Sequence, residues 1–297
     1  MKALFWCAQL LLTSSVALLT HASKLDGGYA YNTYSVPFFS ELLKVCISAI
    51  LLAMDHKGKP KETFDWTWHM ILASSVPAVA YFVSNNINFF VVHYLGPSTF
   101  QLLSSLKVVS TAFFFRAVMG VQLSGTKWKM LVLVSLGCAV SQLGCSNKSL
   151  TDSSIGYVLK FVNILTTGLA SVYNEKILKS SQTTSVHLQN LLLYLWGVLF
   201  AVCSLFISSP SVFGNPKEIL KGYSSITFCI VVNYALVGLA TSFVLKYLDN
   251  IAKTFAAAAS MFLVAIFSYI FFAETLTTSV FIGMLIVVIS CEVYYRE

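Results

Sequence analysis

Lys107 has the clearest chemical potential in this sequence, because its charge lies inside a long apolar run that contains no acid. Gln101, Ser104 and Ser105 share one side of a helix with Lys107, so this run has a partly polar face. A charge inside a membrane span is costly and usually marks a binding site or a transport pathway. We interpret Lys107 as a residue that binds an anionic ligand in a water-filled cavity. An acid from another helix is the alternative partner.

Lys253 is the counterpart of Lys107 in the second half of the chain. It ends the polar run 246–253 at the start of another apolar segment, and the small residues 256–260 follow it. A helix start presents free backbone N–H groups and the positive end of the helix dipole, both of which suit a phosphate. The sequence therefore indicates a second phosphate-facing cation. The alternative is an ordinary basic residue of a cytosolic loop.

Amide and phenol side chains gather in two further segments. Tyr81 and Asn85 lie near the end of the third apolar run, and Asn190, Tyr194 and Gly197 lie in the seventh. The spacing of four residues aligns Asn190 with Tyr194 on one helix face. Such groups can hydrogen-bond a base or a ribose, and a tyrosine ring can stack on a base. Hydrogen bonding between helices is the alternative.

Three other charged positions lie in or near apolar runs. Glu41 and Lys44 are three residues apart on one predicted helix, where they can pair with each other. This spacing favours a structural role, with gating or orientation of a substrate as the alternative. Lys160 lies near an end of its run, where a lysine side chain can extend to the membrane surface. We therefore assign no site to Lys160.

The composition indicates what kind of fold positions these residues. The chain has 297 residues, of which 57% are hydrophobic and only 10% are charged, and its mean hydropathy is +0.77. Soluble, disordered, coiled-coil and nucleic-acid-binding proteins all carry more charge. The apolar runs are long and continuous, which is typical of helices in a lipid bilayer. The sequence therefore predicts an all-α integral membrane protein.

Ten apolar segments, separated by short breaks rich in Gly, Pro, Asn and Asp, are expected to span the membrane. The first segment also resembles a cleavable signal peptide. We keep it as a span because nine spans would not form the repeat described below. The expected spans are residues 3–22, 35–54, 67–87, 97–117, 127–145, 154–174, 187–208, 224–245, 250–272 and 276–294.

The basic residues predict the orientation of these spans. If both termini are cytosolic, most Lys and Arg residues of the loops fall on the cytosolic side, as the positive-inside rule requires. The glycosylation sequon at Asn147 then lies on the opposite side of the membrane, close to its surface.

Weak similarity between residues 121–140 and 274–293 indicates an internal repeat. Aligned without gaps, Val134 meets Val287 and Cys138 meets Cys291. Because five is an odd number, two five-helix halves must have opposite orientations, which is typical of secondary transporters. We predict a single transmembrane transporter domain over residues 1–297. Its ten transmembrane helices form two inverted five-helix repeats, at residues 1–145 and 146–297.

Motifs for enzymatic chemistry are absent from the sequence. It contains no P-loop, no HExxH and no GxSxG motif. The five histidines and seven cysteines have no metal-ligand spacing. We therefore predict no enzyme activity, no metal site and no cofactor.

Nine short motifs in this order resemble the nucleotide-sugar transporters of the drug/metabolite transporter superfamily, and most closely the CMP-sialic acid transporter group. The resemblance covers nearly the whole chain. The motifs are DGGY at 26–29, VPF at 36–38, ELLK at 41–44, YFVSNN at 81–86, PSTFQ at 97–101, LK at 106–107, VYNEKILK at 172–179, QNLLLY at 189–194 and KYLDNIAK at 246–253.

The resemblance implies an antiporter in the Golgi membrane, with the endoplasmic reticulum as the alternative location. It implies ten helices, cytosolic termini and exchange of a cytosolic nucleotide sugar for a lumenal nucleoside monophosphate. Lys107 and Lys253 match the pair that faces the phosphate, and Glu175 and Lys176 match a polar pair following the sixth helix. The positions that the resemblance places in or near the nucleotide pocket are Tyr81, Asn85, Gln101, Asn190, Tyr194, Trp196 and Gly197.

Two positions depart from the CMP-sialic acid transporter pattern. Trp196 replaces a small serine, and Phe100 replaces a tyrosine just before Gln101. Both changes alter the expected pocket, so the sequence leaves either CMP-sialic acid or a UDP-linked sugar as the substrate. A homo-oligomer is compatible with the sequence.

Two other functions stay open at this point. An exporter of drugs or phosphorylated metabolites would share the fold but bind nucleotides poorly. A regulatory membrane protein would keep the fold without transport.

Overall fold

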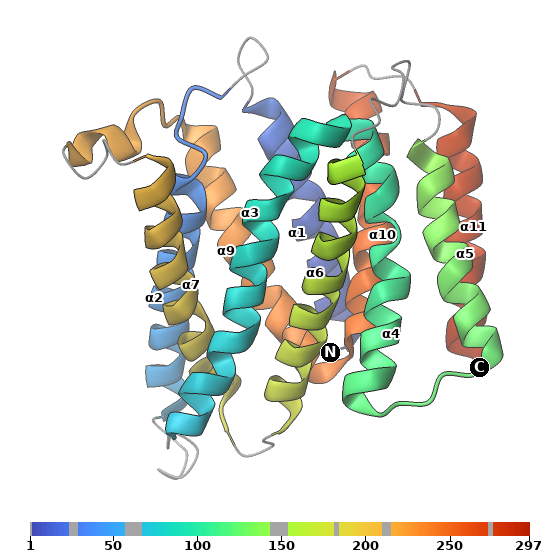
Figure 1. The fold of residues 1–297 in the computed structure, drawn as a ribbon, viewed down its shortest axis with the longest axis horizontal. Helices are drawn as coiled ribbons and strands as arrows, with labels where there is room; N and C mark the ends of the chain where they lie inside the picture. The colour runs from blue at the N-terminus through green and yellow to red at the C-terminus, as the bar shows by residue number, and fades with distance from the viewer. Residues whose placement is uncertain are drawn as a thin grey trace. The chain divides into compact units, whose positions relative to one another are not determined.

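The computed structural model describes residues 2–23, 29–56, 67–142, 154–180, 184–209, 215–272 and 276–297. Asn147 and the DGG sequence at 26–28 lie outside these residues. The described chain forms ten α-helices and one short 3-10 helix, and no strand (Figure 1). They are α1 (Lys2–Ala22), α2 (Ser35–His56), α3 (Trp68–Ser104), α4 (Lys107–Met119), α5 (Gly125–Gln142), α6 (Ser154–Ser180), α7 (Val186–Ser208), η3 (Pro216–Leu220), α9 (Ser225–Tyr247), α10 (Asn250–Phe272) and α11 (Thr278–Arg296).

The length and composition of these helices suit a lipid bilayer. By these two criteria, seven of the described helices can cross a membrane, namely α1, α2, α6, α7, α9, α10 and α11. The predicted all-α, multi-pass fold is therefore confirmed. The arrangement as two inverted repeats stays a prediction.

Helix α3 differs from the expected pattern. We expected a break in helical structure between the third and fourth spans, near residues 88–96. Instead α3 runs without interruption from Trp68 to Ser104, and Figure 1 shows that it bends sharply towards its C-terminal end. Backbone groups inside a membrane must bond within the helix, which favours a bent helix over a broken one.

The interruption comes later, at the junction of α3 and α4. The N–H of Leu106 donates to the carbonyl of Leu103 at 3.1 Å, and the N–H of Val108 donates to that of Ser105 at 3.2 Å. These bonds span three residues instead of four, so they form a tight 3-10 turn. Lys107, which we expected inside an uninterrupted span, is therefore the first residue of α4.

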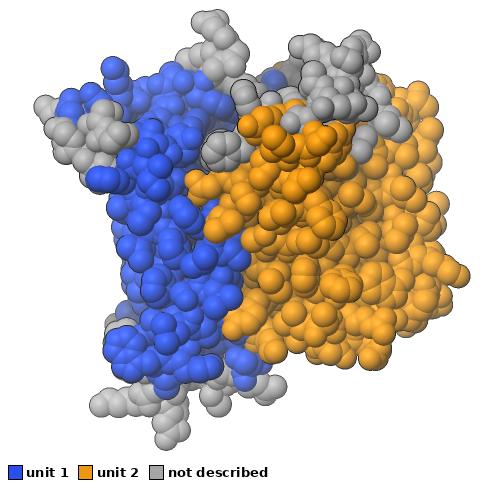
Figure 2. Space-filling view, viewed as in Figure 1, with its two compact units in different colours: residues 1–82, 177–248 blue, residues 83–176, 249–297 orange. Residues whose placement is uncertain are grey.

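The chain forms two compact units, each of which takes segments from both halves of the sequence (Figure 2). Unit 1 contains Met1–Phe82 and Ile177–Leu248, and unit 2 contains Val83–Lys176 and Asp249–Glu297. The predicted single domain with halves at 1–145 and 146–297 stays a prediction.

In unit 1, α2 packs against α7 and α9, and α1 packs against α9. Polar contacts join α1 to α9, because Asn233 donates to Ser15 at 2.6 Å and Thr241 donates to Gln9 at 3.1 Å. Such bonds between helices are common in membrane proteins, where lipid offers no polar partner.

In unit 2, α5 and α11 pack closely along each other. A Cβ atom added to Gly283 would lie only 2.5 Å from the carbonyl oxygen of Gly137. The two glycines therefore allow the backbones to approach as larger residues could not. Val134 and Val287 lie in the same apolar core, which also contains buried residues of α4 and α10.

Candidate functional site

Three lysines on three helices of unit 2 are linked by electrostatic interactions. Lys107 begins α4, Lys160 lies in α6 and Lys253 lies in the first turn of α10. The charge of Lys107 acts on the charges of both Lys160 and Lys253. We call these three residues the lysine row. The row is a concentration of positive charge in helices expected to cross a membrane.

The position of Lys160 differs from the one we expected from the sequence. We expected its side chain to reach the membrane surface, but only 2% of the residue is exposed. Its Nζ donates to Ser104 Oγ at 2.6 Å, at the end of α3 and three residues before Lys107. Sequence analysis missed Lys160 because it lies close to the start of its helix. A lysine in an apolar run without an acid was the same signal that identified Lys107.

Lys253 is held by a hydrogen-bonded chain between α10 and α6. Its Nζ donates to Ser171 Oγ. Ser171 Oγ donates in turn to Asn250 Oδ1 at 2.7 Å. Lys253 is therefore part of the contact between two helices of unit 2 rather than an isolated loop charge.

The start of α10 also differs from the expectation of free backbone donors. The N–H of Asn250 donates to Glu175 Oε2 at 3.0 Å, and the N–H of Ala252 donates to Asp249 Oδ1 at 2.6 Å. Two carboxylates of the protein thus cap the helix and balance its dipole. A phosphate at this position would compete with them, so the lysine side chains are the better candidates for binding it.

Glu175 and Lys176 do not act as one pair. Helix α6 extends to Ser180, so both residues lie inside it and not after it, as we had expected. Glu175 is fully buried and faces α10, whereas Lys176 is exposed. Their separation follows from helical geometry, because neighbouring residues point about 100° apart.

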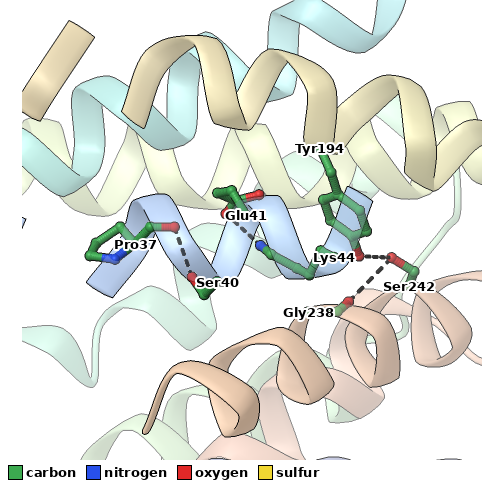
Figure 3. Close-up of polar contacts among 7 residues, drawn as sticks. All are labelled: Pro37, Ser40, Glu41, Lys44, Tyr194, Gly238 and Ser242. Atoms are coloured by element: carbon green, nitrogen blue, oxygen red, sulfur yellow. Dashed lines mark hydrogen bonds and ion pairs between the residues drawn. The ribbon is translucent and has the colours of Figure 1, made fainter. Parts of the chain in front are cut away.

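Glu41 and Lys44 form the predicted ion pair in unit 1 (Figure 3). Lys44 Nζ donates to Glu41 Oε1 along one face of α2. The same ammonium lies 4.6 Å from the centre of the Tyr194 ring on α7, a distance suited to a cation–π interaction. The pair is therefore embedded among neighbouring helices rather than exposed.

Two glycines make room for this ion pair. A Cβ atom on Gly197 of α7 would lie 2.6 Å from Glu41 Oε2, and one on Gly238 of α9 would lie 2.6 Å from Lys44 Cδ. A larger residue at either position would require the Glu41 or Lys44 side chain to shift. Gly197, which we expected in the nucleotide pocket, thus lies against the Glu41 carboxylate.

Tyr194 is held by α9, and the buried amide of Asn190 precedes it on α7. The Tyr194 hydroxyl forms a hydrogen bond with Ser242 Oγ (Figure 3), and the two oxygens are 3.1 Å apart. Asn190, one turn earlier on α7, is 0% exposed. Neither its amide nitrogen nor its amide oxygen has a hydrogen-bond partner among the residues that the structure describes. Buried polar groups are nearly always bonded, so this amide is a candidate for contact with a ligand.

Tyr81 and Trp196 occupy different surroundings in unit 1. Tyr81 lies close enough to Tyr194 to affect it electrostatically. Trp196 Nε1 donates to the carbonyl of Ile71 on α3 at 3.0 Å, and its ring stacks on Phe200. Residues two apart on a helix point about 200° apart, so Trp196 and Tyr194 lie on different faces of α7.

For the remaining predicted site residues, the structure does not describe the side chains. Asn85 and Gln101 belong to α3, but their side chains lie outside the described part of the structure, as does that of Phe100. Within the described ranges, no three His, Cys, Asp or Glu side chains are grouped so that they could hold a metal ion.

Comparison with known proteins gives consistent matches along the whole chain. A family model described as "Nucleotide-sugar transporter" matches residues 1–295. CMP-sialic acid transporter 1 of Oryza sativa subsp. japonica is 32% identical over 299 residues, covering 96% of this chain and 91% of that protein. CMP-sialic acid transporter 1 of Arabidopsis thaliana is 33% identical over 297 residues, covering 96% and 87%.

One solved structure has a similar fold. This crystal structure of a protein superposes with a TM-score of 0.75 over 98% of this chain and 95% of the other, at 14% sequence identity. At that identity the likeness concerns the fold alone.

Proposed function

This chain belongs to the nucleotide-sugar transporter family, and we propose that it works as an antiporter. It exchanges a cytosolic pyrimidine nucleotide sugar for a lumenal nucleoside monophosphate by alternating access between two inverted repeats. The family makes the chain a multi-pass membrane transporter and not an enzyme. Its place is the Golgi membrane, with both termini in the cytosol.

The lysine row is the observation that carries this proposal. Lys107, Lys160 and Lys253 bring three basic side chains into unit 2, and among the described residues the charge of Glu175 acts on Lys253. An excess of buried charge is costly unless a counter-charge is present. A substrate phosphate supplies that counter-charge, because phosphate oxygens form strong hydrogen bonds with ammonium groups.

Asn190, Tyr194 and Tyr81 support recognition of a nucleoside. A pyrimidine base offers both hydrogen-bond donors and acceptors at its edge, and the amide of Asn190 has one group of each kind without a partner among the described residues. The tyrosine rings provide surfaces on which a flat base can stack. The Oryza sativa and Arabidopsis thaliana relatives are named for CMP-sialic acid, which supports a pyrimidine nucleotide as the substrate class.

Transport of a phosphorylated metabolite is the second candidate, because the lysine row would attract any organic phosphate. This second function predicts that affinity depends on the phosphate of the ligand and does not change with the base. A comparison of CMP, UMP, AMP and GMP with glucose 6-phosphate as competitors separates the two. A strong preference for pyrimidine nucleotides supports the first candidate.

Exchange in proteoliposomes tests the proposed function. Vesicles that contain the purified protein are loaded with CMP, UMP or buffer, and uptake of labelled CMP-sialic acid and UDP-sugars is measured. The proposal expects uptake that requires a nucleoside monophosphate inside the vesicle. Uptake that is the same in buffer-loaded vesicles contradicts antiport, and no uptake under any condition supports a protein that has lost transport.

A further inference from the structure

We propose that Ser48 of α2 is a further substrate-binding residue, whose hydroxyl binds the edge of the pyrimidine base together with the amide of Asn190 on α7. This inference rests on the proposed function and deepens it, because it adds a residue to the recognition of the base. Two observations carry it. One is the register of α2 against α7, and the other is the burial of two polar side chains that lack partners among the described residues.

Helices α2 and α7 pack together in unit 1, and two contacts define their register. Lys44 of α2 faces Tyr194 of α7, because its ammonium lies 4.6 Å from the centre of the ring. Glu41, three residues earlier on α2, faces Gly197, three residues later on α7. The helices are therefore antiparallel, and each step towards the end of α2 is matched by a step towards the start of α7.

The same register places Ser48 opposite Asn190. Ser48 lies four residues, about one helical turn, beyond the lysine of the first contact, and Asn190 lies four residues before the tyrosine. The helices stay together beyond this level, because Ser185 Oγ, directly before α7, donates to Asp55 Oδ2 near the end of α2 at 3.0 Å. The Ser48 hydroxyl and the Asn190 amide therefore lie at one level of the contact between the two helices.

Both side chains are fully buried and unsatisfied. Ser48 and Asn190 are each 0% exposed. Within the described ranges, neither the Ser48 hydroxyl nor either polar atom of the Asn190 amide has a hydrogen-bond partner. A serine inside a helix commonly bonds a carbonyl of the preceding turn, as Ser40 does with Pro37 at 2.9 Å (Figure 3). Two unsatisfied groups at one level are costly unless a ligand binds them, because each loses its bonds to water on burial.

The chemistry of this pair suits a nucleobase. Both groups are neutral, and the nearby charges of Glu41 and Lys44 are already paired with each other. A neutral part of the ligand therefore fits this place better than a phosphate does. The edge of a pyrimidine presents three hydrogen-bonding groups in a row. An amide can bind two of them, and a serine hydroxyl, which can donate or accept, can bind the third.

Both groups are closed to solvent in this structure, so the base reaches them after neighbouring side chains move. In the proposed mechanism alternating access provides such a movement, because the site must open to each side of the membrane in turn. The unsatisfied groups reduce the cost of this opening, since contact with water or with the base restores their hydrogen bonds.

The experiment measures the affinities of UMP and ribose 5-phosphate for the purified protein in detergent. Ribose 5-phosphate keeps the sugar and the phosphate of UMP but lacks the base. Ser48→Ala should weaken UMP binding roughly 2- to 10-fold, the size expected for one lost hydrogen bond. The affinity for ribose 5-phosphate should stay unchanged. Ser40→Ala is the matched control and should change neither affinity, because it removes a buried hydroxyl of the same helix that already has a partner.

Two further measurements do not depend on this comparison. The melting temperature of the ligand-free Ser48→Ala variant should stay unchanged or rise, because the variant lacks a buried polar group that had no described partner. In the double variant with Asn190→Leu, the loss of UMP affinity should be smaller than the product of the two single losses, because both side chains bind one base. If Ser48→Ala does not fold, Ser48→Cys decides the question, since a thiol is a weaker hydrogen-bonding group and should also weaken UMP binding.

Three results overturn the inference in distinguishable ways. Unchanged UMP affinity in Ser48→Ala means that the hydroxyl has a structural role only, such as binding a buried water. An equal loss of affinity for UMP and ribose 5-phosphate places Ser48 at the ribose or the phosphate instead of the base. If the unaltered protein binds neither UMP nor CMP, the proposed function itself fails, and this inference fails with it.

Discussion

The carboxylate of Glu175 accepts the backbone N–H of Asn250 at 3.0 Å, so an acid of α6 caps the start of α10. The same carboxylate acts electrostatically on Lys253. Glu175 therefore has two effects in unit 2. It stabilises the contact between two helices, and it reduces the positive charge that Lys253 presents to an anion.

Glu175→Gln separates these two effects. Glutamine keeps an oxygen that can accept the Asn250 N–H but removes the negative charge. We expect the variant to fold and to bind UMP several-fold to roughly tenfold more tightly, because one repulsive charge is gone. Glu292→Gln, at an exposed acid of α11 that pairs with Arg296, is the control and should leave UMP affinity unchanged. Weaker UMP binding in Glu175→Gln would show that Glu175 favours the anion rather than opposing it.

Gly197→Ala tests the packing around the ion pair of unit 1. The added methyl group would lie 2.6 Å from Glu41 Oε2, so the Glu41 carboxylate must shift from its place beside Lys44. We expect a loss of about 1–3 kcal/mol in the free energy of unfolding, which is typical of overpacking. A thermal unfolding curve in detergent measures the change. Gly125→Ala is the matched control, because nothing lies within 4 Å of its added methyl group. Equal stability of both variants would mean that the Glu41 carboxylate moves aside without cost.

Asn190→Leu tests whether the buried amide is kept for a ligand. Leucine is similar in size and has no polar atoms, so it should raise the stability of the ligand-free protein by about 1–2 kcal/mol. Binding of UMP should weaken roughly tenfold at the same time.

Asn163→Leu in α6 is the contrasting variant. The amide of Asn163 donates to the carbonyl and the hydroxyl of Ser84, each at 2.8 Å, so its loss should lower stability. If Asn190→Leu also lowers stability and leaves UMP affinity unchanged, Asn190 is a structural residue and not part of a pocket.

Most of the fold follows from the sequence, because long apolar runs bounded by turn residues place helices directly. The ends of α1, α2, α7, α9 and α10 lie within two residues of the predicted spans. The junction of α3 and α4 could not be placed in the same way. Polar residues and Gly96-Pro97 indicated a break, but a helix in a membrane keeps its backbone bonds through such residues by bending.

The site was predicted less completely, because its geometry depends on partners that lie far away in the chain. Spacing alone placed Glu41 beside Lys44, since both belong to one turn of one helix. It could not place Lys160 against Ser104, which is 56 residues away. Nor could it show that Asp249 and Glu175 occupy the backbone donors of α10 that we expected to be open.

The central claim is that Lys107 and Lys253 bind the phosphate of the substrate, and one binding measurement tests it most directly. Purified Lys107→Ala and Lys253→Ala variants are titrated with UMP and with uridine, which differ only by the phosphate. We expect each variant to lose roughly tenfold to hundredfold in UMP affinity, because a charge-assisted bond contributes about 1.5–3 kcal/mol. Uridine affinity should be nearly unchanged, and the thermal stability of the variants should confirm that they fold. A variant that binds UMP as tightly as the unaltered protein, or that loses UMP and uridine affinity equally, would contradict the claim for that lysine.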